Sequence, residues 1–259
     1  MRFVRVLSFI AALTASSTAI AQDGKWVTIK GQIKLENAPA ATDINVTTDK
    51  QHCLSKGPLK TDDLVVNPKN NGIKNVVVYL RPDDKDRNAK FKPSEINPEL
   101  ANPKSVEHVI DQPCCQFVPR IVVARVGDTI TVKNSAPVNH NIKYESDNNG
   151  SGNWNMPAGT SQKFKAPCAA EPRPIPFECN VHPWMKGQIR IFDHPYYAIT
   201  DADGKFEIKG APAGKYRIVY AHEKGYHKGA AGRLGEVIEI KAASNNTMEM
   251  KPIDYDFPK

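Results

Sequence analysis

A short run in the second half of the chain places three metal-binding side chains close together. Cys179, His182 and Met185 follow one another at intervals of three in the segment Cys-Asn-Val-His-Pro-Trp-Met. A fourth candidate, His140, lies upstream in Asn-His-Asn-Ile. A thiolate, two imidazoles and a thioether form the ligand set of a mononuclear blue-copper site, in which the Met is a weak axial ligand. The four residues therefore predict one copper ion that cycles between Cu(I) and Cu(II).

This spacing also constrains the fold, because a tight loop can supply three of the ligands and a separate segment must supply His140. Residues 129–133 alternate apolar and polar side chains after a Gly127-Asp128 turn, and residues 188–192 alternate in the same way after the loop. Such alternation is typical of strands with one buried face. Since no segment of the chain shows a sustained helical period, we expect an all-β fold in which strands flank the ligand loop.

From about Glu107 to Asp193 the chain resembles a cupredoxin. Its ligand loop is most similar to that of the amicyanins, which share the short Cys-x-x-His-Pro-aromatic-Met pattern. The resemblance implies a Greek-key β-sandwich that holds copper near one end. It also implies three strong ligands and one axial ligand, which are His140, Cys179, His182 and, in the axial position, Met185.

Two further expectations come with this resemblance. Asn141 matches the asparagine that often follows the first His ligand, and its side chain would tie the two ligand-bearing segments together. His182 would turn a ring edge to an apolar surface patch that includes Pro183 and Trp184, where electrons would enter and leave. Zinc is the rival metal for Cys and His ligands, but zinc rarely uses Met, so the pattern favours copper.

The last part of the chain resembles the carboxypeptidase-regulatory-like, or transthyretin-like, β-sandwich. The similarity rests on residues 200–208 (Thr-Asp-Ala-Asp-Gly-Lys-Phe-Glu-Ile) and 212–216 (Pro-Ala-Gly-Lys-Tyr). In that family two earlier strands precede this pattern, and matching segments occur here near the N-terminus, at 30–33 and 75–80. One copy of the family can therefore be assembled from the two ends of the chain.

We accordingly expect a cupredoxin domain at 105–193 that is inserted into a smaller transthyretin-like sandwich built from 22–104 and 194–259. The alternative is that the N-terminal region completes the cupredoxin while the tail forms a small domain of its own. The tail alone offers few strands with which to enclose a core, which favours the insertion.

Other metal-like patterns in the chain are weaker. Asp201-x-Asp203-Gly204 would need an oxygen ligand at position 199 and a glutamate at position 210 to form an EF-hand loop, but the chain has Ile199 and Gly210 there. This segment therefore predicts a hairpin turn. His222-Glu223 and His227 could also be read as metal ligands, but we expect a local hydrogen bond for His222 instead. The spacing of His52, His108 and His194 predicts no site.

The N-terminus predicts where the protein works. Arg2 and Arg5 precede an apolar run at 6–13, and Ala19-Ile-Ala21 is a small-x-small cleavage signal. This pattern predicts that residues 1–21 are a secretory signal peptide. The apolar run is too short to span a bilayer. We expect a periplasmic or secreted protein without a membrane span.

The cysteines fit an oxidising compartment. The chain has five, and reserving Cys179 for copper leaves two disulfides in three connectivities. A bridge between the neighbours Cys114 and Cys115 would be strained. The expected pattern joins Cys53 to one of these neighbours and Cys168 to the other, with the order left open. In the rival interpretation some of the four are free buried thiols.

Charge and missing motifs bound the function. The formal net charge is +7, and the scattered lysines suit an acidic redox partner, because a positive surface steers association with a negative one. No nucleic-acid-binding module is visible. We expect a type 1 copper protein that exchanges one electron with a cytochrome or a dehydrogenase. The alternatives are a copper carrier or storage protein, and a binding or adhesion module with a structural copper site.

The ligand set also predicts that the chain is not an enzyme. Four protein ligands fill the coordination sphere and leave no open position for a substrate. The His-x-His pairs and the His-Cys-His bridge of a multicopper oxidase are missing from the sequence, and no ligands for a second copper are visible.

Overall fold

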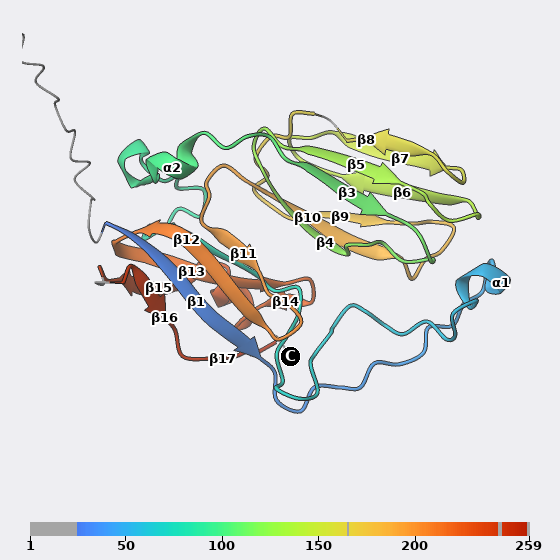
Figure 1. The fold of residues 1–259 in the computed structure, drawn as a ribbon, viewed down its shortest axis with the longest axis horizontal. Helices are drawn as coiled ribbons and strands as arrows, with labels where there is room; N and C mark the ends of the chain where they lie inside the picture. The colour runs from blue at the N-terminus through green and yellow to red at the C-terminus, as the bar shows by residue number, and fades with distance from the viewer. Residues whose placement is uncertain (1–24, 165, 243–244, 258–259) are drawn as a thin grey trace, which may run out of the picture.

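The computed structural model describes residues 25–164, 166–242 and 245–257, and strands dominate it. The predicted signal peptide at 1–21 lies outside the described residues. Figure 1 shows two β-sandwiches, one above the other, joined through several crossings of the chain. The helical elements are single turns, which are Lys50–Cys53 (α1), Pro93–Glu95 (η1), Pro98–Ala101 (α2) and Gly229–Gly232 (α3). The prediction of an all-β fold is therefore confirmed.

The upper sandwich of Figure 1 consists of eight strands in two sheets. The five-stranded sheet has the order β4-β10-β9-β6-β7, and the three-stranded sheet has the order β3-β5-β8. The strands are Glu107–Asp111 (β3), Ile121–Arg125 (β4), Thr129–Lys133 (β5), His140–Glu145 (β6), Ser151–Met156 (β7), Ser161–Lys163 (β8), Ile175–Glu178 (β9) and Lys186–Phe192 (β10).

Alternating side chains place the core of the upper sandwich between its two sheets. In β5 the apolar residues Ile130 and Val132 are buried while their neighbours are not. Phe177 of β9 and Phe164 enter the same core, and both are almost fully buried. The period of two that predicted these strands is thus the period that fills the core.

The lower sandwich of Figure 1 combines strands from both ends of the chain. One sheet has the order β12-β1-β16, with β17 also paired to β1; the other has the order β11-β2-β13-β14, with β15 also paired to β13. The strands are Trp26–Lys34 (β1), Val77–Pro82 (β2), Tyr197–Ile199 (β11), Lys205–Pro212 (β12), Gly214–His222 (β13), Gly225–Tyr226 (β14), Glu236–Ile240 (β15), Thr247–Glu249 (β16) and Ile253–Asp254 (β17).

The N-terminal strands make their main pairings with C-terminal ones. β1 pairs antiparallel with β12, and β2 pairs antiparallel with both β11 and β13. We propose that these strands form one discontinuous domain that carries the upper sandwich as an insertion. If so, a chain truncated after Pro195 should lose protection of β1 and β2 from proteolysis. A truncated protein that keeps those strands protected would contradict the proposal.

The two sandwiches touch through strand faces that point away from their own cores. Val77 of β2 packs with Ile121 and Phe192 of the upper sandwich. Beside this contact, the Arg120 guanidinium makes a bidentate ion pair with the Glu223 carboxylate, with N–O distances of 2.6 and 2.7 Å. These apolar and ionic contacts fix how the lower sandwich sits against the sheet that carries the ligand loop.

A long connection between β1 and β2, residues 35–76, leaves the lower sandwich and reaches the far end of the upper one (Figure 1). We call it the strap. Its two arms are joined by backbone hydrogen bonds such as that from Ile44 N to Leu59 O, at 2.8 Å. Helix α1 lies at its tip, and a disulfide from Cys53 to Cys115 fastens that tip to the upper sandwich. In the described part of the chain, no helix is long and apolar enough to cross a membrane.

Candidate metal centre

The predicted ligand loop is the connection between β9 and β10. The strands pair antiparallel up to Glu178 and Lys186. Two backbone hydrogen bonds close the loop, one from Cys179 N to Met185 O at 3.1 Å and one from Met185 N to His182 O at 2.8 Å. A short, closed loop of this kind holds its side chains in a narrow range of positions, which a metal site requires.

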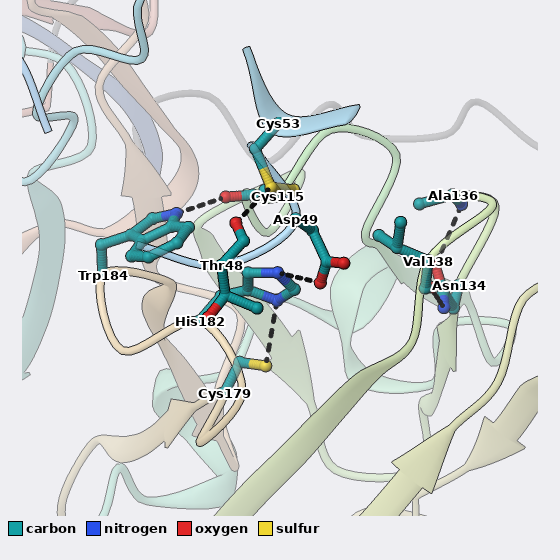
Figure 2. Close-up of a disulfide and its surroundings, with 10 residues drawn as sticks. All are labelled: Thr48, Asp49, Cys53, Cys115, Asn134, Ala136, Val138, Cys179, His182 and Trp184. Carbon is teal, nitrogen blue, oxygen red and sulfur yellow. Dashed lines mark hydrogen bonds and ion pairs between the residues drawn. A yellow bond between two sulfur atoms is a disulfide. The ribbon is translucent and has the colours of Figure 1, made fainter. Parts of the chain in front are cut away.

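His140 reaches the loop because β6 lies beside β9 in the same sheet. Lys143 of β6 pairs with Glu178 of β9, so the start of β6 lies level with the loop beyond the end of β9. The ligand atoms of His140, Cys179 and His182 all lie within 4.8 Å of one another. The His182 Nδ1 atom is 3.9 Å from the Cys179 Sγ atom (Figure 2).

Burial prepares these three side chains for a metal ion. The side chains are at most 1% exposed, and both ring nitrogens of His140 lack a hydrogen-bond partner among the described residues. Burial, with the nearby rings of His182 and His52, lowers the pKa of His140 to about 4. The ring is therefore neutral at physiological pH and offers a lone pair. A buried polar group without a partner is costly, and a bound metal would remove that cost, so the site fits copper.

Met185 lies in the same buried cluster as Cys179 and is 1% exposed. Its backbone closes the loop, as described above. The assignment of its sulfur as the axial ligand stays a prediction, as does the copper-binding role of the other three residues.

Asn141 joins the two ligand-bearing segments, in the position that the resemblance implied. Its backbone N–H points at the Cys179 sulfur, at 3.4 Å, and its side-chain oxygen accepts a hydrogen bond from Asn180 N at 2.6 Å. Its amide nitrogen donates to Asn153 on β7, at 2.7 Å. One residue thus holds the thiol, the ligand loop and the neighbouring strand in register.

Asn134 stabilises, through its side-chain hydrogen bonds, the segment that leads into His140. This side chain is 1% exposed, and its amide donates to the carbonyls of Val138 and Met156, at 2.8 and 2.7 Å. Its oxygen accepts from Ala136 N, at 3.0 Å (Figure 2). These bonds fix the loop between β5 and β6, so that β6 begins at His140.

The expectation of an open His182 edge is wrong. The strap crosses over this end of the sandwich, and the His182 ring is fully buried beneath it. The His182 Nε2–H donates to the Asp49 carboxylate, at 3.0 Å (Figure 2). The cysteine sulfurs of the Cys53–Cys115 bridge also lie within 4.8 Å of a His182 ring nitrogen. The ring is covered because a distant, disulfide-fastened segment lies on it.

Trp184 is half-buried beside this cover. Its indole N–H donates to the carbonyl of Cys115, at 3.0 Å, and its ring meets that of His182 edge-on with 5.2 Å between centroids. The structure therefore shows this side chain packed beside the site.

The disulfide prediction is confirmed for one bridge and wrong for the other. Cys53 pairs with Cys115, while Cys114 keeps a half-buried thiol whose pKa burial raises. The expected second bridge would join Cys114 to Cys168. The backbone of Cys168 bonds to the Gly127-Asp128 turn, beyond the end of β4 that lies away from the ligand loop. Five residues of strand span roughly 17 Å, and a disulfide needs Cα atoms within about 7 Å.

The site contains two residues that the sequence did not point to, Asp49 and His52. Both lie on the tip of the strap, and His52 has a buried Nε2 without a hydrogen-bond partner in the described chain. The pairing of Cys53 with Cys115 and the packing of the strap on the upper core bring them to the metal centre, and the sequence left that pairing open. The other histidines stay apart from the site: His222 Nδ1, for example, accepts a local hydrogen bond from Lys224 N, at 3.2 Å, as expected.

The Asp201–Gly204 segment forms a turn. Asp201 accepts hydrogen bonds from the backbone of Asp203 and Lys205, and Asp203 accepts one from the side chain of Asn67, at 2.7 Å. These partners satisfy both carboxylates within the protein, in line with the prediction of a hairpin turn.

No protein-family model matches the chain, and no curated protein matches it. Solved structures do. A purple cupredoxin from Nitrosopumilus maritimus is 21% identical over 33% of this chain and 99% of its own, with a TM-score of 0.27. A reduced amicyanin variant is 18% identical over 44% of this chain and 99% of its own, with a TM-score of 0.28. A copper-containing nitrite reductase from Thermus scotoductus is 19% identical over 36% of this chain and 23% of its own, with a TM-score of 0.29.

The prediction that the chain is not an enzyme is contradicted by the last of these matches, because that neighbour is a nitrite reductase. The structural neighbours are cupredoxins, in line with that part of the sequence resemblance. The transthyretin-like part stays a prediction.

Proposed function

We propose that this protein is a type 1 copper protein that passes single electrons, with His140, Cys179 and His182 as strong ligands and Met185 as the axial one. The observation that carries the proposal is the meeting of three buried donor side chains within 4.8 Å, one of them an imidazole without a hydrogen-bond partner in the described chain. A bound copper ion would supply the one-electron couple.

The residues around the site would keep its geometry the same in both redox states. The Asn141 N–H points at the Cys179 sulfur and would stabilise the thiolate. The Asp49 carboxylate accepts a hydrogen bond from the Nε2–H group of His182, which leaves the Nδ1 lone pair facing Cys179. Rigid, buried ligands cost little reorganisation when an electron arrives, which favours rapid transfer.

Electrons would reach the site through the covered end of the sandwich. Asp49 and Trp184 both contact the buried His182 ring, and the Asp49 side chain is 35% exposed. We place partner docking over these two residues, in contrast to docking on the His182 ring itself. The partner would be a cytochrome or a dehydrogenase with an acidic surface, which suits the positive net charge of the mature chain, +7 for the full sequence less the two charges of Arg2 and Arg5. A secretory signal at 1–21 would direct the protein to the periplasm or beyond.

Loading the purified mature protein with Cu(II) tests this proposal. We expect intense visible absorption and narrow copper hyperfine splitting in the electron paramagnetic resonance spectrum. The change Cys179→Ala should abolish both, whereas the matched change Cys114→Ala, which removes a thiol outside the site, should leave them intact. Met185→Gln should keep the copper and lower its potential. A pale wild-type spectrum with ordinary hyperfine splitting would refute the ligand assignment. It would favour the alternative function, that of a copper carrier.

A further inference from the structure

A second cavity, separate from the metal centre, lies where the two sandwiches meet. It has a volume of about 480 Å³ and is walled by β2 of the lower sandwich, by β10 of the upper one, and by loop residues around 87–90 and 170–173. A volume of this size suits a small molecule. Six of its lining side chains are cationic, namely Arg81, Arg87, Lys90, Arg173, Arg190 and Arg233. Two are carboxylates, Glu171 and Asp193.

Arg190 is the least expected residue in this wall. It lies on β10 between Ile189 and Ile191, which fill the core of the upper sandwich, so its side chain points outward to β2. It is only 6% exposed, and its guanidinium carbon lies 5.0 Å from the centre of the Tyr79 ring and 5.5 Å from that of Phe192. A buried guanidinium normally pairs with a carboxylate, because an isolated buried charge is costly.

Within the described part of the chain, Arg190 has no such partner. It makes no ion pair there, and its Nη1 atom is buried without a hydrogen bond. The two carboxylates of the wall are already engaged. Asp193 lies 3.3 Å from Lys90 Nζ, and the Glu171 oxygens accept from the backbone N–H groups of Asn148 and Asn149.

The neighbouring cations increase the need for an anion. Arg81 is 5% exposed and donates only to neutral carbonyls, those of Leu234 at 2.7 Å and Asp86 at 2.5 Å. Burial lowers the pKa of Arg81. Two buried guanidiniums thus line one cleft, and neither makes a direct ion pair with a carboxylate among the described residues, although the nearby Asp84 and Asp86 carboxylates offset part of the charge of Arg81. An anion bound between them would reduce the cost of burying both.

We propose that this cavity binds a small organic acid, whose carboxylate pairs with Arg190 while its carbon skeleton packs on Tyr79 and Tyr226. Both tyrosines line the cavity. The planar guanidinium can donate two parallel hydrogen bonds to a carboxylate, and the aromatic rings favour an acid with apolar carbons over a bare inorganic ion. Because the walls come from both sandwiches, the bound acid would also hold them together.

Calorimetric titration of the copper-loaded mature protein at low ionic strength tests the proposal, with succinate, benzene-1,2-dicarboxylate and inorganic phosphate as probes. We expect at least one of the two carboxylates to bind more tightly than phosphate. The change Arg190→Gln should weaken that binding roughly tenfold or more. The change Lys60→Gln, which removes the same charge from an exposed residue of the strap, should leave the affinity within about twofold.

The unfolding temperature distinguishes a binding role from a structural one. Since Arg190 is a costly buried charge without an ion-pair partner in the described chain, Arg190→Gln should leave the free protein at least as stable as before. The added carboxylate should raise the unfolding temperature of the wild type only. Carboxylate binding that survives Arg190→Gln, or no binding of any probe, would overturn the site. Tighter binding of phosphate would overturn the class of ligand. None of these results bears on the copper spectrum, so the proposed function is tested separately.

Discussion

Removing the Cys53–Cys115 disulfide should both destabilise the protein and uncover His182. The bridge joins residues 62 positions apart. In the chain-entropy description, a cross-link of this span stabilises the folded state by about 4 kcal/mol, because it restricts the unfolded chain. We expect the double change Cys53→Ala and Cys115→Ala to lower the free energy of unfolding by about this amount. The tip of the strap would then have no covalent link to the upper sandwich, and the hydrogen bond from His182 to Asp49 and the packing of Val46, Ile44 and Leu59 on the upper core would hold the strap there.

Denaturant unfolding of the copper-free protein without reductant measures the first effect. Wild type in excess reductant is the control, since it loses the same bridge without losing side-chain volume, and its midpoint should move in the same direction. Modification of histidines by diethyl pyrocarbonate, followed by peptide mass spectrometry, measures the second effect. His182 should become reactive in the double variant, while His222, buried in the lower sandwich, should stay protected. A variant within about 1 kcal/mol of wild type, or a His182 that stays unreactive, would refute the reasoning.

The remaining predictions concern charge. Asp49→Asn should raise the midpoint potential of the copper site, because it removes a negative charge that lies 3.0 Å from a ligand ring and favours Cu(II). An unchanged potential in protein-film voltammetry would contradict this electrostatic role. Burial and, to a smaller extent, the nearby Lys224 lower the pKa of His222 to about 4 in the folded protein. In the unfolded chain the same histidine has a pKa of about 6.5, so as the pH falls the unfolded state takes up a proton before the folded state does. The stability that this neutral ring contributes is therefore complete above pH 6.5 and is lost as the pH falls to 4, by about 3 kcal/mol. Chemical unfolding of the copper-free protein at pH 7 and pH 4 measures this loss. The free energy of unfolding of His222→Asn should fall by about 3 kcal/mol less from pH 7 to pH 4 than that of the wild type, and equal losses in the two proteins would count against the linkage.

Local sequence determined much of the candidate site. The Cys179–Met185 loop needs only a hairpin between two strands to bring its ligands together, and the strands are visible as a period of two in residues 129–133 and 188–192. Because neighbouring strands of one sheet lie about 5 Å apart, a histidine at the start of β6 falls beside that loop. Short-range spacing and alternation are therefore enough to predict the ligand loop, whereas the pairing of β6 with β9 brings His140 to it.

Tertiary structure alone decided what surrounds those residues. The strap that covers His182 comes from a segment more than a hundred positions away, and the partner of Cys53 was ambiguous because Cys114 and Cys115 are neighbours. The cleft at Arg190 depends on how the outer faces of β2 and β10 meet. Alternation marks a side chain as pointing outward, but it does not say whether water or another sheet lies there. The sequence by itself therefore predicted the ligands, while long-range packing determined how the ligands are covered and where an unpaired charge is buried.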